Sequence, residues 1–420
     1  MGVNAQYWTE KASGFTNVNS TLPSISIVDA NVIWAETNVG AGNYFTKSIN
    51  GGNTWTAGFI FLNGQPLNVS NISAFSATTA WVSTYGSGGQ QGIWKTTDGG
   101  TTWTRQASAQ FGTADSFPSF VHFWGDALTG ICVGDAKTGD TVFEIYETAD
   151  GGTTWTGGPN INIPVMLTGE YTLTNNYDYS GNTIWFGTTK GRLFRSINNG
   201  SDWTVSQTPE TGNLGKFSFS DYNQLNGLGK GILITNAGQL YKTIDGGDNW
   251  TLIPTTGFNI GAISYVPNTS YVVSTGTSAL PGSSYSLDDG ATWTTIDGVH
   301  HNKAYFMNVN VGFSGGKNTS PTAGGIFKYS STPLFVERFD AEKQIFVSPN
   351  PTSGILHLDS ENSLIKETTV FDLLGRQIYS SKFSALNKVD LDLKSLQSGT
   401  YVLKVTSDSG KMESLKIMKN

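Results

Sequence analysis

The chain has 420 residues, of which 12% are aromatic and only 14% are charged, and it contains 51 glycines. This length allows two domains, or one large repeat fold with a small companion. The composition favours many short strands joined by tight turns and disfavours a disordered chain. We therefore expect an all-β protein.

The formal net charge is −7, and residues 1–335 carry 14 basic and 21 acidic side chains. Nucleic acid is not expected as a partner, because phosphate binding needs clustered positive charge. Cys132 is the only cysteine, so the chain can form neither an internal disulfide nor a metal site of several thiolates. We expect no metal and no cofactor, and no apolar run is long enough to cross a membrane.

The first residues, 1–5, contain Val3-Asn4-Ala5, which fits the small-x-small end of a secretory signal. We expect residues 1–5 to remain from a signal peptide or to have been added for expression. An ordinary chain terminus is the alternative.

A phrase of the form [ST]-x-[DN]-x-G-x-x-W then occurs six times between Ser48 and Trp293, at intervals of 43 to 52 residues. Each phrase predicts a hairpin turn, in which the Asp or Asn accepts backbone hydrogen bonds, the glycine takes a positive φ and the tryptophan is buried. The turn residues are Asn50, Asp98, Asp150, Asn198, Asp245 and Asp288, and the tryptophans are Trp55, Trp103, Trp155, Trp203, Trp250 and Trp293.

Three strand-like runs precede each phrase, so each unit predicts a four-stranded antiparallel sheet suited to a propeller blade. A seventh unit follows but lacks the phrase at Ser330, and its fourth strand is missing. Tyr7-Trp8-Thr9 looks like that strand, carried at the other end of the chain. We expect residues 6–335 to form a seven-bladed β-propeller closed by the N-terminal strand, which leaves no exposed sheet edges.

The six phrases resemble the Asp-box, or BNR repeat, of sialidase-like, sortilin-like and photosystem-assembly-factor-like propellers. The resemblance implies that the phrase residues are structural and lie on the face opposite the ligand site. The sequence departs from sialidases, which need three converging arginines, because this region contains only Arg105, Arg192 and Arg195, at unsuitable positions.

After a linker at residues 336–344, residues 345–420 alternate apolar and polar side chains and predict a small β-sandwich of about seven strands. Their motifs closely resemble those of the type A C-terminal sorting domain of the type IX secretion system. The motif residues are Pro349, Asn350, Pro351, Gly354, Asp372, Gly375, Arg376, Gly399 and Tyr401.

The sorting-domain resemblance implies export by a Bacteroidetes-type, Gram-negative bacterium to its outer-membrane surface or beyond. It also implies that the translocon and its outer-membrane shuttle protein bind residues 345–420, and that a sortase-like peptidase removes them.

In a propeller of this kind, the loops after the second and fourth strands share the face that normally holds the ligand. Candidates on that face are Glu36, Tyr85, Asp135, Asp140, Lys190, Arg192, His300, His301 and Lys317. They form no recognisable catalytic phrase, and the adjacent histidines lack an acidic residue at a spacing suited to a metal.

We expect a secreted or cell-surface module that binds or adheres to an extracellular glycan or protein. The alternative is a glycoside hydrolase, sialidase-like or xyloglucanase-like, with two carboxylates in the axial pocket at about 5–9.5 Å separation. The sequence does not identify the ligand.

Overall fold

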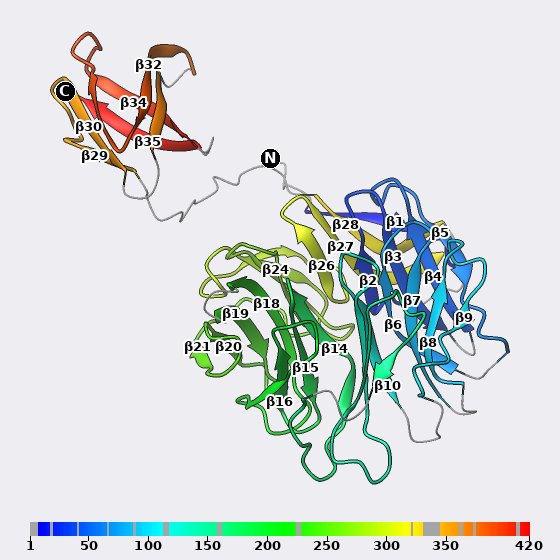
Figure 1. The fold of residues 1–420 in the computed structure, drawn as a ribbon. Helices are drawn as coiled ribbons and strands as arrows, with labels where there is room; N and C mark the ends of the chain where they lie inside the picture. The colour runs from blue at the N-terminus through cyan, green and yellow to red at the C-terminus, as the bar shows by residue number, and fades with distance from the viewer. Residues whose placement is uncertain are drawn as a thin grey trace. The chain divides into compact units, whose positions relative to one another are not determined.

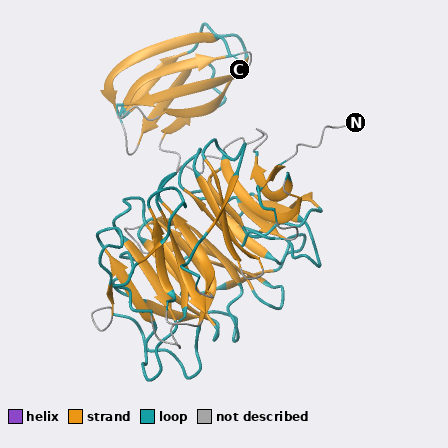
Figure 2. Ribbon diagram, turned by 90° about the vertical axis from the view of Figure 1, so that its right-hand side faces the viewer, coloured by secondary structure: helices purple, strands orange, loops and turns teal. Residues whose placement is uncertain are grey.

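The fold is described from a computed structural model of the whole chain. The described residues are 7–16, 20–39, 42–64, 67–86, 90–111, 117–157, 162–223, 228–320, 322–330, 345–360, 364–372, 375–408 and 412–420. The chain divides into two compact units, Met1–Thr332 and Pro333–Asn420. Across the described ranges the secondary structure is β only, and no helix that could span a membrane is present (Figure 2).

Seven four-stranded antiparallel sheets make up the first unit, and we number them blades 1 to 7 in chain order (Figure 1). Blade 1 contains β2 (Ser24–Ile27), β3 (Ile33–Val39), β4 (Gly42–Ser48) and β5 (Thr56–Phe59), and blade 2 contains β6 (Leu67–Ala74), β7 (Ala80–Gly86), β8 (Gly92–Thr96) and β9 (Thr104–Arg105). Blade 3 contains β10 (Pro118–Phe123), β11 (Gly130–Gly134), β12 (Glu144–Thr148) and β13 (Thr156–Gly157). Blade 4 contains β14 (Thr172–Ser180), β15 (Thr183–Thr188), β16 (Arg192–Ser196) and β17 (Thr204–Gln207).

Blade 5 contains β18 (Lys216–Asn223), β19 (Leu228–Ile234), β20 (Leu240–Thr243) and β21 (Thr251–Ile253). Blade 6 contains β22 (Ala262–Tyr265), β23 (Val272–Thr275), β24 (Ser283–Ser286) and β25 (Thr294–Asp297). Blade 7 contains β26 (Ala304–Asn308), β27 (Val311–Ser320), β28 (Ala323–Tyr329) and β1 (Trp8–Ala12). The first strands of neighbouring blades contact one another around a closed circuit from β2 to β26 and back to β2. These seven first strands therefore surround the axis of the ring.

The ring is closed by the N-terminal strand, as predicted. β1 pairs antiparallel with β28, from Trp8 opposite Tyr329 to Ala12 opposite Gly325, and thereby becomes the fourth strand of blade 7. In Figure 1 the blue β1 lies beside the yellow β28. The indole of Trp8 is 3% exposed, so closing the ring also buries a large aromatic side chain.

The six repeated phrases form turns between the third and fourth strands of blades 1 to 6. In blade 2, Thr96 Oγ1 donates to Asp98 and accepts from the backbone N–H of Gly100, while Asp98 accepts from the N–H and hydroxyl of Thr102. These hydrogen bonds hold the pKa of the Asp98 carboxyl at about 2, with the Thr102 hydroxyl as the largest cause. Gly100 has a φ of +93°, and a Cβ there would collide with the Phe45 ring of blade 1.

The tryptophans of these phrases pack between blades, but not all equally. Trp55, Trp103, Trp155 and Trp203 are buried, whereas Trp250 and Trp293 are only partly buried, which corrects the expectation of six buried rings. In four of the six, the indole N–H donates to the carbonyl of the glycine three residues earlier.

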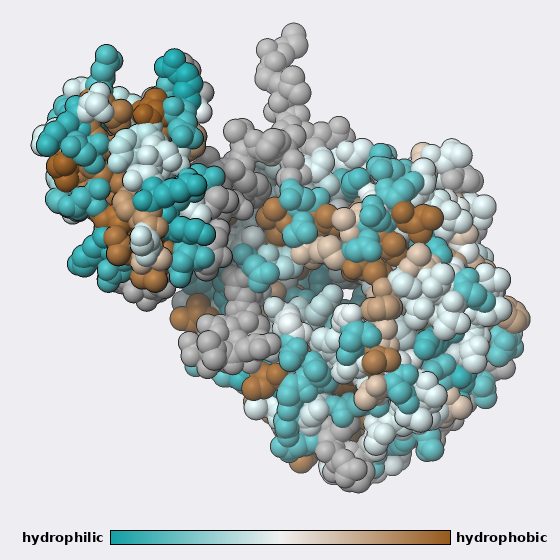
Figure 3. All heavy atoms as spheres, turned by 45° about the horizontal axis from the view of Figure 1, so that its top comes forward, coloured by the Kyte–Doolittle hydropathy of each residue, from teal (hydrophilic) through white to brown (hydrophobic). Residues whose placement is uncertain are grey.

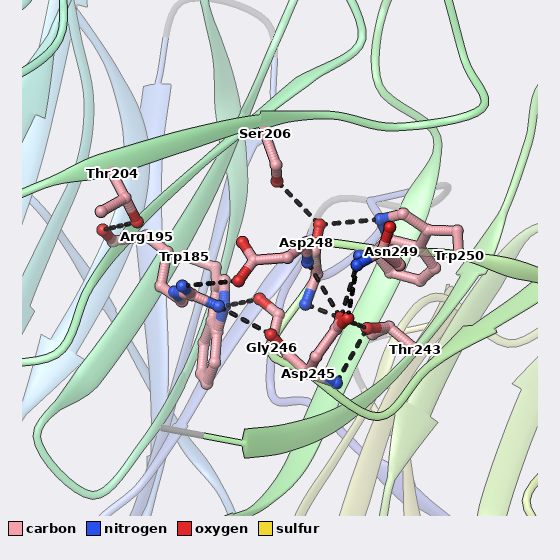
Figure 4. Close-up of polar contacts among 11 residues, drawn as sticks. Trp185, Arg195, Thr204, Ser206, Thr243, Asp245, Gly246, Asp248, Asn249 and Trp250 are labelled. Atoms are coloured by element: carbon pink, nitrogen blue, oxygen red, sulfur yellow. Dashed lines mark hydrogen bonds and ion pairs between the residues drawn. The ribbon is translucent and has the colours of Figure 1, made fainter. Parts of the chain in front are cut away.

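A further contact joins neighbouring blades through the basic residue just before three of the six phrases, Lys47, Lys95 and Arg195. Arg195 of blade 4 donates to the carbonyl oxygen of Asp245 in the turn of blade 5 at 2.9 Å, and pairs with Asp248 at 3.1 Å (Figure 4). Lys47 and Lys95 reach the turns of blades 2 and 3 in the same way, at Gly99 and Gly151. At these three junctions, blade 1 to blade 2, blade 2 to blade 3 and blade 4 to blade 5, charge-assisted hydrogen bonds add to the apolar packing between neighbours.

The second unit is a small sandwich of two sheets, with strand orders β29-β30-β33 and β32-β31-β34-β35. Its strands are β29 (Ile345–Ser348), β30 (Ile355–Ser360), β31 (Ile365–Phe371), β32 (Gln377–Leu386), β33 (Lys388–Asp392), β34 (Gly399–Ser407) and β35 (Met412–Lys419). Alternate residues of both sheets form one apolar core, including Leu356, Val370 and Leu403. The predicted sandwich is confirmed.

The sorting motifs occupy turns of this sandwich. The amide of Asn350 bonds the backbone of Lys416 and of Met418, which holds the segment after β29 on β35. Arg376 pairs with Asp372 at 2.7 Å across the turn that contains Gly375. The Tyr401 hydroxyl donates to the carbonyl of Gln397. Gly354 accepts from the N–H of Leu393, and Pro349, Pro351 and Gly399 lie beside these same turns.

Candidate functional site: an axial cavity

A cavity of about 500 Å³ opens at the axis of the propeller. Its lining comes from the first strands of blades 2, 4, 5, 6 and 7, near their N-terminal ends, and from loops that precede first strands or follow second strands. This is the face on which the sequence predicted a ligand. Figure 3 shows the propeller surface hollowed near its middle, with hydrophobic and hydrophilic residues around the hollow.

The charged side chains of the lining are basic. Lys216 begins β18 and Lys303 immediately precedes β26, so the ring geometry brings together residues from blades 5 and 7. His300 also lines the cavity. Its pKa is lowered mainly by burial, and further by the nearby charges of His301 and Lys317. Among the described residues that line the cavity there is no Asp and no Glu.

Amides and aromatic rings complete the lining. Asn175, Asn176 and Asn302 donate to backbone carbonyls around the cavity, at Pro23, Gly215 and Leu22. The Tyr305 hydroxyl also donates to Pro23, and the Tyr177 ring stacks on Phe120 with centroids 4.3 Å apart. These contacts fix the side chains in place, so the cavity is preformed rather than assembled by rearrangement.

Three of the residues singled out from sequence line this cavity: Tyr85, His300 and His301. His301 is fully buried, and its Nε2 lies 3.0 Å from Asp297 Oδ2. Among the described residues, no group of three or more His, Cys, Asp and Glu side chains is placed to hold a metal ion.

Glu36 lies beside the cavity but does not line it. Its side chain is fully buried in β3, and neither carboxyl oxygen has a hydrogen-bond partner among the described residues. Burial raises the pKa of this carboxyl to about 8. Glu36 is therefore mainly uncharged at pH 7. The pKa of Tyr85 is raised, chiefly because its ring is buried and secondly because the Glu36 carboxyl is near.

Asp135 and Arg192 are engaged in contacts that join loops. Asp135 accepts from both the N–H and the hydroxyl of Thr172, at 2.7 Å each, and so links blades 3 and 4. Arg192 lies 3.3 Å from the buried Glu170 and also bonds the carbonyl of Val165. Neither side chain reaches the axial cavity.

The other three candidates are also elsewhere. Asp140 lines a second cavity of about 470 Å³ on blade 3, where Lys137 pairs with Glu144 at 2.7 Å. Lys190 lies in the turn between β15 and β16, and Lys317 is exposed on β27. The residues proposed as one ligand face are thus distributed over several separate surfaces.

Sequence reasoning missed Lys216 and Lys303. Aligning the repeats on their first strands would have placed both lysines at the start of that strand, in "GKFSF" and "NKAYF". It would not have shown that these two blades face one cavity, because that follows only from the curvature of the ring.

The fold and the tail define a β-propeller exported with a sorting domain. Residues 346–420 match the family model described as the secretion system C-terminal sorting domain. The chain therefore carries a type IX sorting tail, which implies a secreted or cell-surface protein of Bacteroidetes-type bacteria.

Among solved structures, the chain is similar to "YCF48 bound to D1 peptide", with a TM-score of 0.54 and 19% identity over 79% of this chain and 99% of that one. It is also similar to YCF48 from Cyanidioschyzon merolae, with a TM-score of 0.52 and 18% identity over 77% and 98%. YCF48 is a photosystem assembly factor, and at this identity the likeness shows the propeller fold alone. No curated protein matches the chain.

Proposed function

We propose that this protein is an extracellular binding or adhesion module that takes part of a glycan or protein into its axial cavity. The observation that carries the proposal is the preformed cavity of about 500 Å³ on the loop face, lined by amides, tyrosines and lysines. Its volume lies in the range of about 300–1,000 Å³ typical of ligand sites.

Hydrolysis is the weaker alternative. A glycosidase normally needs two carboxyl groups about 5–9.5 Å apart on either side of the bond that is cleaved. The described lining contains none, and Glu36 is buried behind it. The cavity therefore favours binding over cleavage of a glycosidic bond.

The test is to incubate the full chain with an array of polysaccharides and glycoproteins, and to measure both retained protein and released fragments by mass spectrometry. Thr174→Trp places an indole in the cavity from an exposed position on β14, and Thr251→Trp makes the same change at an exposed position on β21. We expect retention without fragments, at least tenfold weaker in Thr174→Trp and unchanged in Thr251→Trp.

Equal retention by the Thr174→Trp protein would place the binding surface elsewhere, for example at the second cavity. Released oligosaccharides or sialic acid would instead support the glycosidase alternative.

We further propose that the translocon and its shuttle protein bind residues 345–420 and that a sortase-like peptidase cleaves before them, at residues 333–344. That linker, like residues 1–5, lies outside the described residues. Mass spectrometry of surface and spent-medium protein should detect propeller peptides without tail peptides. An intact chain in the medium would contradict cleavage.

A further inference from the structure

We propose that the axial cavity binds a carboxylate-bearing sugar residue, with the ammonium groups of Lys216 and Lys303 as its anchor. This inference rests on the proposed function, since it names the chemical class of the ligand that the cavity takes.

The first argument is the unbalanced charge of the cavity. Neither Lys216 nor Lys303 makes a hydrogen bond or ion pair with a described residue, and Lys303 Nζ lies 5.4 Å from the centroid of the Tyr305 ring. Burial, and then the nearby Lys303 ammonium, lowers the pKa of Lys216. Lys216 is nevertheless exposed and Lys303 half-buried, so water screens part of their mutual repulsion, and a bound anion would neutralise the rest.

The charge of the surrounding domain strengthens this argument. Residues 1–335 carry seven more acidic than basic side chains, 21 against 14, so a basic cavity is contrary to the average charge of the domain. The two lysines therefore point to a specific anionic group.

The remaining lining indicates a sugar rather than a simple anion or an acidic peptide. Asn175, Asn176 and Asn302 each present an amide, which both donates and accepts hydrogen bonds as sugar hydroxyls require. The rings of Tyr85 in blade 2 and Tyr305 in blade 7 add aromatic surface to the lining, on which the C–H face of a sugar ring can pack.

The test uses the full chain and measures affinity by isothermal titration calorimetry. The acidic probes are polygalacturonate, for uronic acids, and sialyllactose, for sialic acid. Their neutral counterparts are methyl-esterified polygalacturonate and lactose. Poly-glutamate tests an acidic peptide. The variants are Lys216→Met, Lys303→Met and, as the matched control, Lys242→Met at an exposed position on β20.

We expect one acidic sugar probe to bind at least tenfold more tightly than its neutral counterpart and than poly-glutamate. Lys216→Met and Lys303→Met should each weaken that binding at least tenfold with unchanged melting temperature, whereas Lys242→Met should bind as the wild type does. Whichever of the two acidic sugars binds then identifies the source of the carboxylate.

The inference is overturned if neutral probes bind equally well, if the two cavity lysine variants bind normally, if poly-glutamate alone binds, or if no acidic sugar binds at all. The proposed function fails separately, if filling the cavity with Thr174→Trp leaves the array ligand bound. Suppose that a neutral ligand from the array binds the wild-type protein and fails to bind the Thr174→Trp protein. That result would contradict this inference and would still support the proposed function.

Discussion

The indole of Trp8 packs against the imidazole of His301, with ring centroids 5.1 Å apart. The Trp8 N–H also donates to Ser283 Oγ, which in turn donates to Asp297, the partner of His301. The strand that closes the ring is thereby connected to a residue that lines the axial cavity. Closure and cavity geometry therefore depend on the same contacts.

Replacing Trp8 by Ala should destabilise the propeller by about 3–5 kcal/mol, the usual cost of deleting a buried tryptophan. Deleting residues 6–12 should cost more, because the edge of β28 also loses its hydrogen bonds. Trp250→Ala, at a partly buried indole, is the matched control and should cost less. Thermal unfolding followed by circular dichroism measures each effect. An unchanged melting curve for the deletion would contradict the role of β1.

Replacing Glu36 by Gln should flatten the dependence of stability on pH. The folded pKa of about 8 exceeds the ordinary value of 4.5, so the wild-type protein loses stability as pH rises between these values. With about 1.4 kcal/mol per pKa unit, Gln should remove roughly 3 kcal/mol of that loss by pH 7. Denaturant unfolding at pH 5, 7 and 8 measures it, with exposed Glu10→Gln as the control. Parallel pH profiles for wild type and Glu36→Gln would refute this account.

Replacing His122 by Phe should protect the propeller against acid. This ring is buried, its Nε2 has no partner among the described residues, and burial lowers its pKa from 6.5 to about 3. The wild-type protein therefore loses stability as pH falls from 6.5 toward 3, by roughly 2 kcal/mol at pH 5. Phe keeps the ring and removes the proton. If both proteins lose the same stability between pH 7 and pH 5, His122 is not responsible.

Glu170→Leu should destabilise blade 4 by about 3–5 kcal/mol, because it leaves the buried Arg192 guanidinium without its carboxylate. The double variant Glu170→Leu/Arg192→Met should recover much of that loss, since no uncompensated charge then remains. A double-mutant cycle in chemical denaturation separates the pair from its packing. Additive losses in the cycle would mean that the two side chains are not coupled.

Asp98→Ala should lower the melting temperature, whereas Asp98→Asn should have little effect at pH 7. Asn already occupies the equivalent place at positions 50 and 198, where its Oδ1 accepts from the backbone N–H four residues later. Because the pKa of Asp98 is about 2, its contribution is present above pH 3.8 and is lost as pH falls toward 2. Equal melting temperatures for the Ala and Asn variants would show that the turn does not need this acceptor.

The blades could be predicted from sequence because each carries its own local signal. The phrase around Asp98 encodes one turn, and the same hydrogen bonds recur wherever it is repeated. The lone Trp8 could be assigned because a sheet with a missing strand needs a partner. The cavity could not be predicted in the same way. Lys216 and Lys303 meet only through the ring, and the burial of Glu36 depends on neighbouring blades rather than on its own strand.

The pairing of β1 with β28 also determines how the propeller should unfold. An open array of repeats frays from its ends, since each end unit lacks one neighbour. In the closed ring every blade has two neighbours, so no blade is a natural starting point for fraying. Loss of any blade opens the whole circuit, and we expect the propeller to melt in one cooperative transition, whereas the same chain without β1 should melt gradually from its exposed end.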